Sequence, residues 1–230
     1  MRLSALLFLL VSLVSHAQGT GPRTCRILFL SGTANSPEKT HLFDGTSSRE
    51  VELPRMGFSP IYEVAAGDIT LAMLPAPPVD PKVIPSGAPK ASVAAGITDF
   101  YIIVAADPTN QITPLRFQIV NANAENFKRG QMLWFNLTGH KIAGLLGTHK
   151  LMMEPNSKTI IDAPTGKQED YHVNIHYLPP GKERSEPVCE TNWSHDPRSR
   201  SVFFVINTNG GKAPRVMGFP DYREPPTEKP

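Results

Sequence analysis

Hydrophobic residues occur in short runs along the chain, and polar residues, glycine and proline separate the runs. The runs are rich in valine, isoleucine, phenylalanine and tyrosine, and none keeps the i, i+3, i+4, i+7 spacing of an amphipathic helix over a helix's length. The pattern therefore predicts an all-β chain. The predicted strands are 26–30, 59–65, 68–74, 99–106, 114–120, 131–137, 149–153, 158–163, 172–178, 201–207 and 214–219.

The order of the predicted strands repeats in the second half of the chain. The segment GDITLAMLP at 67–75 aligns without a gap with YHVNIHYLP at 171–179. The repeat indicates an internal duplication of a unit that is long enough for a self-contained sandwich. We expect two tandem immunoglobulin-like β-sandwich units, and the alternative is one continuous sandwich or barrel with internal pseudo-symmetry. The other aligned pairs are 27–30 with 132–135, 99–107 with 201–209, and 115–117 with 215–217.

Local composition sets the boundaries within this plan. Residues 75–89 are rich in proline, which removes ladder donors, so they are predicted to run over the surface as a stiff loop. Their counterpart at 179–200 is predicted as a longer polar loop. The expected divisions are a signal peptide at 1–17, a first sandwich unit at 24–122, a connector at 123–130, a second unit at 131–220 and a flexible tail at 221–230.

The first seventeen residues have the features of a secretory signal peptide. One early cation, Arg2, precedes an apolar stretch, and Ser15 and Ala17 are small residues at the −3 and −1 positions of a cleavage site before Gln18. The apolar stretch is too short to span a membrane. We therefore expect an exported protein, periplasmic or extracellular, without a transmembrane anchor.

Charge and cysteine content narrow the class of partner and the source of stability. The chain has 23 Lys and Arg against 21 Asp and Glu, a balance that gives no electrostatic reason to expect nucleic acid as a partner. Only Cys25 and Cys189 are available for disulfides, so a hydrophobic core must hold the fold. The two cysteines could pair in an exported protein, or they could be separate buried thiols.

Two histidines in the run YHVNIHYLPP at 171–180 invite a metal-site interpretation. On a strand, His172, Asn174 and His176 share one face, while Val173 and its alternate neighbours share the other. At a rise of about 3.3 Å per residue the two histidines lie ~13 Å apart, too far for both to bind one ion. We expect no metal site and no cofactor.

The segment TNWSHDPRSR at 191–200 is the densest group of functional side chains. Trp193 could act as an aromatic anchor of a binding loop, with His195, Arg198 and Arg200 contacting carboxylates, sulfate or sugar hydroxyls. The alternative is a polar turn whose tryptophan packs back on the sandwich. Neighbouring Ser, His and Asp on one short loop generally point apart, so no catalytic triad is expected.

The segments RILFLSG, THLFDG and YEVAAGDITLAMLP follow one another in the first copy. In this order they resemble the small β-sandwich domains of unknown function found in exported bacterial proteins. The resemblance covers about fifty residues of the first copy and is poorer in the second. It implies an extracytoplasmic β module and assigns no functional residue.

Together these patterns predict a non-catalytic binding or structural protein of the cell envelope, whose partner is an envelope protein or a glycan. The alternative is a hydrolase or carbohydrate-active enzyme with its site in the groove between the units. Its acids would be residues such as Glu125, Asp162 and Asp196, because paired carboxylates have no local sequence signature.

Overall fold

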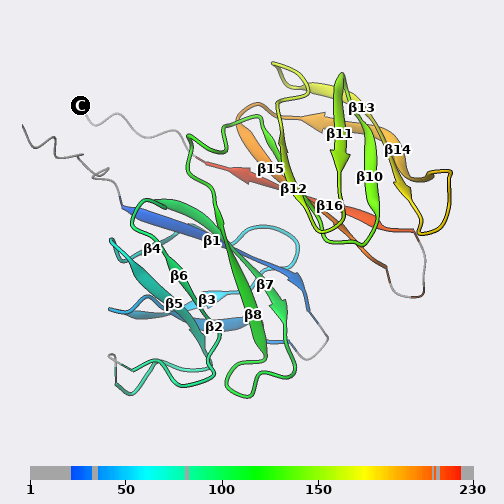
Figure 1. Ribbon diagram of the computed structural model, residues 1–230. Coiled ribbons are helices and arrows are strands. Elements are labelled where there is room, and N and C mark those ends of the chain that lie inside the picture. Colours follow the sequence, from blue (N-terminus) through cyan, green and yellow to red (C-terminus); the bar gives the residue numbers. More distant parts are fainter. Residues whose placement is uncertain (1–21, 33–35, 81–82, 209, 211–212, 224–230) are drawn as a thin grey trace, which may run out of the picture.

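The computed structural model describes residues 22–32, 36–80, 83–208, 210 and 213–223 (Figure 1). Every helix or strand in these ranges is a β-strand, which confirms the predicted all-β class. The first unit contains β1 Arg23–Ser31, β2 Lys39–Phe43, β3 Ser48–Glu52, β4 Tyr62–Val64, β5 Ile69–Leu74, β6 Lys90–Val93, β7 Asp99–Ala106 and β8 Leu115–Asn121. The second unit contains β9 Met132–Asn136, β10 Lys141–Leu146, β11 His149–Met153, β12 Lys158–Ile161, β13 Glu169–Leu178, β14 Glu186–His195, β15 Ser199–Ile206 and β16 Arg215–Tyr222.

The two units share one strand topology. The first has an inner sheet, β4-β1-β7-β8, and an outer sheet, β3-β2-β5-β6. The second has an inner sheet, β12-β9-β15-β16, and an outer sheet, β11-β10-β13-β14, which is the same order applied to the second set of strands. In both units only the central pair of the inner sheet, β1 with β7 and β9 with β15, runs parallel. The prediction of two tandem β-sandwich units is therefore confirmed.

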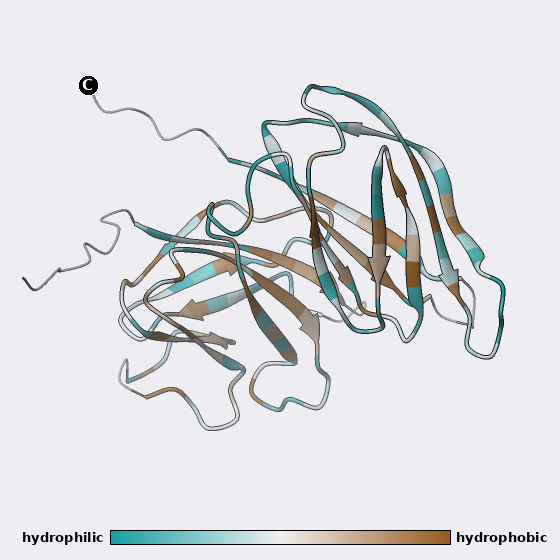
Figure 2. Ribbon diagram, turned by 45° about the horizontal axis from the view of Figure 1, so that its top comes forward, coloured by the Kyte–Doolittle hydropathy of each residue, from teal (hydrophilic) through white to brown (hydrophobic). Residues whose placement is uncertain are grey.

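Each sandwich encloses its own hydrophobic core. Ile27, Leu71 and Ile102 are central in the first, and Trp134, Ile175 and Val205 are central in the second. In the outer sheet of the second unit one face is exposed to solvent, and hydrophobic and polar residues alternate along β13 (Figure 2). In the first unit, β5 is buried on both faces, because Ala72 and Leu74 pack in a separate small cluster with Ala88.

Strand β13 shows the alternation that its sequence predicts. Val173, Ile175 and Tyr177 are buried in the core, whereas His172 is exposed and His176 is half-buried on the outer face.

A third hydrophobic cluster lies between the two units, where the two inner sheets meet. It joins Leu28 and Tyr101 of the first unit to Phe135, Val202 and Phe204 of the second. We call this cluster the inter-unit interface. The central strands of the inner sheets, β1, β7, β9 and β15, are consequently buried on both faces, one toward their own sandwich core and one toward the other unit.

Burial on both faces explains an error in the repeat alignment. The match of 99–107 with 201–209 pairs Phe100 and Ile102, which face the first core, with Val202 and Phe204, which face the inter-unit interface. Because both faces are hydrophobic, these strands lack the alternation of hydrophobic and polar residues that normally marks the two faces. An alignment that is shifted by one residue therefore matches the sequence equally well. The match of 115–117 with 215–217 also exchanges the two faces.

All eleven predicted strands are present, but β2, β3, β6, β10 and β14 are absent from the prediction. The largest correction concerns β14, which forms a ten-residue edge strand inside the predicted loop 179–200. Its side chains Glu190, Thr191 and Asn192 are exposed, so it lacks the hydrophobic run by which the other strands are recognised. The strands β2 and β3 flank a turn at Asp44 and Gly45, where Gly45 has a φ of 90°.

The ends of the chain differ partly from the expected divisions. The predicted signal peptide at 1–17 lies outside the described residues. Strand β16 continues past residue 220, and Asp221, expected in the flexible tail, is buried. Residues 224–230 of that tail also lie outside the described residues. No helix in the described part of the chain is long and apolar enough to cross a membrane.

Both cysteines are free thiols, and they lie in different sandwiches. Cys25 on β1 is buried in the first core, whereas Cys189 on β14 is half-buried against the second. Burial raises the pKa of the Cys25 thiol to about 12 and also raises the pKa of Cys189. Of the two expected arrangements, the structure has the separate thiols.

Candidate functional site

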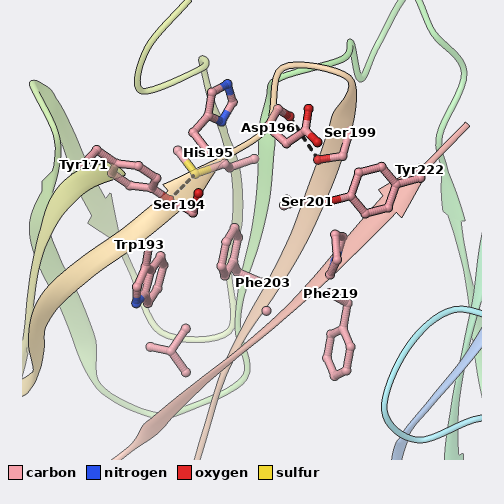
Figure 3. Close-up of a pocket in the computed structure, with 14 residues that line it drawn as sticks. Tyr171, Trp193, Ser194, His195, Asp196, Ser199, Ser201, Phe203, Phe219 and Tyr222 are labelled. Atoms are coloured by element: carbon pink, nitrogen blue, oxygen red, sulfur yellow. Dashed lines mark hydrogen bonds between the residues drawn. The ribbon is translucent and has the colours of Figure 1, made fainter. Parts of the chain in front are cut away.

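A cleft of about 410 Å³ opens at one edge of the second sandwich, between β14 of the outer sheet and β15 and β16 of the inner sheet (Figure 3). We call it the aromatic cleft. Residues from β13 and from the turn between β14 and β15 complete its wall. Its lining consists of Met132, Tyr171, Trp193, Ser194, His195, Asp196, Ser199, Ser201, Phe203, Val216, Gly218, Phe219, Pro220 and Tyr222.

Stacked aromatic rings form the floor of the cleft. The Trp193 and Phe203 ring centroids are 5.1 Å apart with planes 4° apart, and Phe203 stacks in turn on Trp134 at 4.4 Å. Trp134 is fully buried, whereas Trp193 is half-buried on the edge strand. The stack therefore holds the Trp193 ring in a fixed orientation beside Phe203, and Figure 3 shows these two rings side by side.

A glycine on β16 makes room for this stack. Gly218 pairs with Phe203 across the two strands, and a Cβ atom at position 218 would lie 2.5 Å from a carbon of the Phe203 ring. Real Cβ contacts are never that short, so any side chain at 218 would displace the ring. The absence of a side chain at Gly218 therefore allows the Phe203 ring to occupy its position in the cleft.

Polar groups lie at the rim above the rings. Asp196 accepts hydrogen bonds from the Arg198 side chain at 2.7 Å and from the Arg198 backbone N–H at 2.9 Å. These bonds lower the pKa of Asp196 to about 2, so it is a carboxylate at neutral pH and a poor general acid. The Ser199 hydroxyl donates to the Asp196 carbonyl at 3.1 Å, which closes the turn.

His195 has an unpartnered polar atom, which is buried beside Gly130. The side chain is buried, its Nε2 atom has no hydrogen-bond partner, and burial lowers its pKa. Within the described residues, no hydrogen bond links His195 to Ser194, Ser199 or Asp196. The hydrogen bonds of a Ser-His-Asp triad are therefore absent there.

The first unit is closed at the corresponding end. The guanidinium of Arg23, the first residue of β1, donates to backbone carbonyls on the β4–β5 and β6–β7 connections, including that of Ile97 at 2.7 Å. In the second unit Gly130 lies two residues before β9, and a Cβ atom at this position would be 3.7 Å from the His195 ring. A buried arginine therefore lies at this end of the first sandwich, and a glycine lies at this end of the second.

The structure separates the four predicted binding residues into two groups. Trp193 and His195 line the aromatic cleft, whereas Arg198 and Arg200 line a second cavity of about 230 Å³ at the inter-unit interface. Trp193 has features of both predicted alternatives, because its ring packs on the sandwich core and also lines the cleft. Tyr171 and Phe203 were not predicted as site residues, because only folding brings them beside Trp193: Tyr171 by strand pairing and Phe203 from the facing sheet.

The acids of the enzyme alternative each have a local partner. Glu125 accepts a hydrogen bond from Asn123, Asp162 accepts one from Gln131 at 2.8 Å, and Asp196 is paired with Arg198. Of the three, only Asp196 lines the aromatic cleft. Among the described residues, no three His, Cys, Asp or Glu side chains are grouped so that they could hold a metal ion.

No protein-family model and no curated protein matches the chain. A solved structure of a DUF3823 family protein from Bacteroides ovatus is similar over 76% of this chain and 99% of that chain, with 13% sequence identity and a TM-score of 0.20. Similarity at this level carries no argument about function. The fold and the cleft define the class of the protein: it is a tandem β-sandwich protein with an aromatic cleft in its second unit.

Proposed function

We propose that the protein is an exported, non-catalytic binding protein of the cell envelope and that the aromatic cleft holds a sugar ring of a glycan. The observation that carries the proposal is the half-buried Trp193 ring, which stacks on Phe203 in the lining of a cleft with polar atoms at its rim. An aromatic face packs against the C–H face of a sugar, while rim groups hydrogen-bond its hydroxyls.

The size and polarity of the cleft support this ligand class. Its volume of about 410 Å³ lies within the range of ~300–1,000 Å³ that is usual for small-ligand sites. Ser201 and His195 supply a hydroxyl and an imidazole group at the wall. Burial lowers the pKa of His195 and so favours an uncharged imidazole in the lining, which suits a neutral sugar.

The difference between the two copies also supports the proposal. The central inner strands of the first unit bring Ile27 and Ile102 side by side in the core, whereas those of the second pair Trp134 with Phe203. Arg23 fills the end of the first sandwich as well. Binding is therefore assigned to the second unit, and the first unit acts as its support.

A glycan array probed with the secreted form of the protein, followed by calorimetric titration of the best glycan, tests the proposal. Trp193→Ala should weaken binding by about 30-fold or more, since truncating a central aromatic anchor costs about 2 kcal/mol or more. Asn192→Ala is the matched control, because Asn192 neighbours Trp193 on β14 with its side chain on the opposite face.

Two results would count against the proposal. If the array yields no ligand, or if Trp193→Ala binds as tightly as the wild type, the cleft is not a glycan site. Conversion of the bound glycan to shorter products would contradict the non-catalytic part and support the hydrolase alternative. Recovery of the protein in the cytoplasmic fraction of its own host would contradict export.

A further inference from the structure

The cavity at the inter-unit interface is a second, chemically different site. It has a volume of about 230 Å³ and is lined by Asp99, Ala124, Phe127, Arg129, Arg198, Arg200, Asp221 and Arg223. Ser199 and Ser201 of β15 face the aromatic cleft, whereas Arg200 between them faces this cavity, so the two sites lie on opposite sides of the strand. Four guanidinium groups and two carboxylates give the lining an excess of positive charge.

Both carboxylates are already saturated by protein groups. Asp221 accepts from the Tyr101 hydroxyl at 2.5 Å and from Arg200 at 3.0 Å, and it also pairs with Arg26 and Arg223. Asp99 accepts from Arg200 at 2.6 Å and contacts Arg223 at 3.0 Å. These carboxylates have no capacity left to neutralise the remaining cations.

Arg129 and Arg198 at the rim keep donors available. One nitrogen of the exposed Arg129 donates to the Arg223 carbonyl at 3.0 Å, and no carboxylate pairs with Arg129 among the described residues. Arg198 uses Nε and Nη2 for Asp196 and is 75% exposed, while its Nη1 has no recorded partner in the same residues. At the base, the buried Arg223 Nη2 contacts Asp99 without hydrogen-bond geometry.

We propose that this cavity binds an oxyanion, that is, a carboxylate, sulfate or phosphate group. Arg129 and Arg198 hold the group at the rim, above the buried network of Arg200 and Asp221. Guanidinium groups suit this role because their planar donors match the oxygens of such anions in a bidentate manner. The inference is independent of the glycan proposal, because it concerns a different cavity and ligand chemistry.

Binding here should stabilise the whole protein. Arg129 comes from the connector between the units and Arg198 from the β14–β15 turn of the second, so one anion would join the connector to the second unit. A ligand that binds only the folded state raises the unfolding temperature in a saturable way. Sulfate and phosphate also stabilise proteins generally by exclusion from their surfaces, an effect that grows without saturation.

The test follows the unfolding temperature of the full-length secreted protein in millimolar phosphate or sulfate, at ionic strength held constant with sodium chloride. The wild type should show a saturable increase. The double variant Arg129→Gln, Arg198→Gln should bind at least about tenfold more weakly, a loss of about 1.4 kcal/mol. Lys128→Gln, which removes a neighbouring exposed cation outside the cavity, should bind like the wild type.

A second arm compares a neutral oligosaccharide with its sulfated or uronic-acid counterpart by calorimetry. Affinity for free phosphate or sulfate identifies a small-ion site, and affinity for the acidic oligosaccharide alone identifies a glycan-borne anion. Either result supports the proposal if the double variant loses it. Equal, unsaturating shifts in the wild type and the double variant, with no preference for the acidic oligosaccharide, overturn it. Loss of glycan binding in Trp193→Ala would leave this outcome unaffected.

Discussion

The buried carboxylate of Asp221 is the point on which the inter-unit interface is most sensitive to a single substitution. Its side chain has no exposed surface, and four groups donate to it or pair with it: Arg26, Tyr101, Arg200 and Arg223. Burial alone would raise its pKa, but the positive charge of Arg223, the Tyr101 hydrogen bond and the charge of Arg200 lower it. The carboxylate is thus kept charged because its partners outweigh the cost of desolvation.

Replacing Asp221 with asparagine should lower the free energy of unfolding by about 3–5 kcal/mol, because it leaves buried guanidinium groups without their counter-charge. Urea unfolding followed by circular dichroism measures the change. Glu63→Gln, on an exposed position of β4, serves as the control and should change stability by no more than about 0.5 kcal/mol. Equal stabilities of the two variants would show that the network contributes nothing to the fold.

His195 should make stability depend on pH near neutrality. Burial lowers its pKa in the folded state, so the unfolded chain binds a proton at a higher pH than the folded protein does. The stabilising contribution is complete above the unfolded pKa of about 6.5 and is lost as the pH falls toward the folded pKa. The unfolding temperature should therefore fall less between pH 7 and pH 5 in His195→Gln than in the wild type. Parallel curves would rule out this role.

Single-residue roles were only partly predictable from the sequence. Trp193 and His195 could be named as candidates because their segment is the densest group of functional side chains in the sequence. The burial of Arg200 could not, since its partners Asp99 and Asp221 are far away in sequence. Only folding brings such charges together, and no local pattern reports it.

At the level of elements, the Phe203 ring depends on the absence of a side chain on its neighbouring strand. Gly218→Ala should displace the ring, which would disturb its stacking on Trp193 and reduce both stability and glycan affinity. We expect a loss of about 1–3 kcal/mol in unfolding free energy, as for overpacked cores. Thermal unfolding and calorimetric titration measure the two effects.

Gly166→Ala is the matched control for this prediction. A Cβ atom at 166 would have no atom within 4 Å, and it lies in the same unit. If Gly218→Ala keeps wild-type stability and affinity, the close approach of β16 to Phe203 does not position the aromatic cleft.

Strands were predictable where they carry a hydrophobic run and unpredictable where they do not. Strand β7, DFYIIVAA, is buried through most of its length, and its predicted and observed limits coincide. Strand β14, EPVCETNWSH, is an edge strand whose order comes from pairing with β13 along its length. Its backbone hydrogen bonds, and not its own composition, make it a strand, so a sequence pattern assigns it to a loop.

For the whole molecule, the inter-unit interface makes the two sandwiches one folding unit. Phe204 is 1% exposed and packs at this interface, with its ring stacked on Phe135 at 5.1 Å. Separation of the units would expose this hydrophobic surface together with the buried charges around Asp221. The tandem arrangement was predictable from the repeated strands, but the interface was not, because a strand buried on both faces looks the same whichever face meets another unit.

Cooperative unfolding follows from this interface and can be measured with the natural probes. The only two tryptophans, Trp134 and Trp193, lie in the second unit, whereas far-ultraviolet circular dichroism reports strands of both units. The two signals should therefore give coincident urea transitions. Leu71→Ala in the first core should shift the tryptophan transition by about 2–5 kcal/mol, and Phe204→Ala at the interface should shift both signals together by about 3–5 kcal/mol. A first-unit substitution that leaves the tryptophan transition unchanged would mean that the units unfold independently, since the interface would then transmit none of the lost stability.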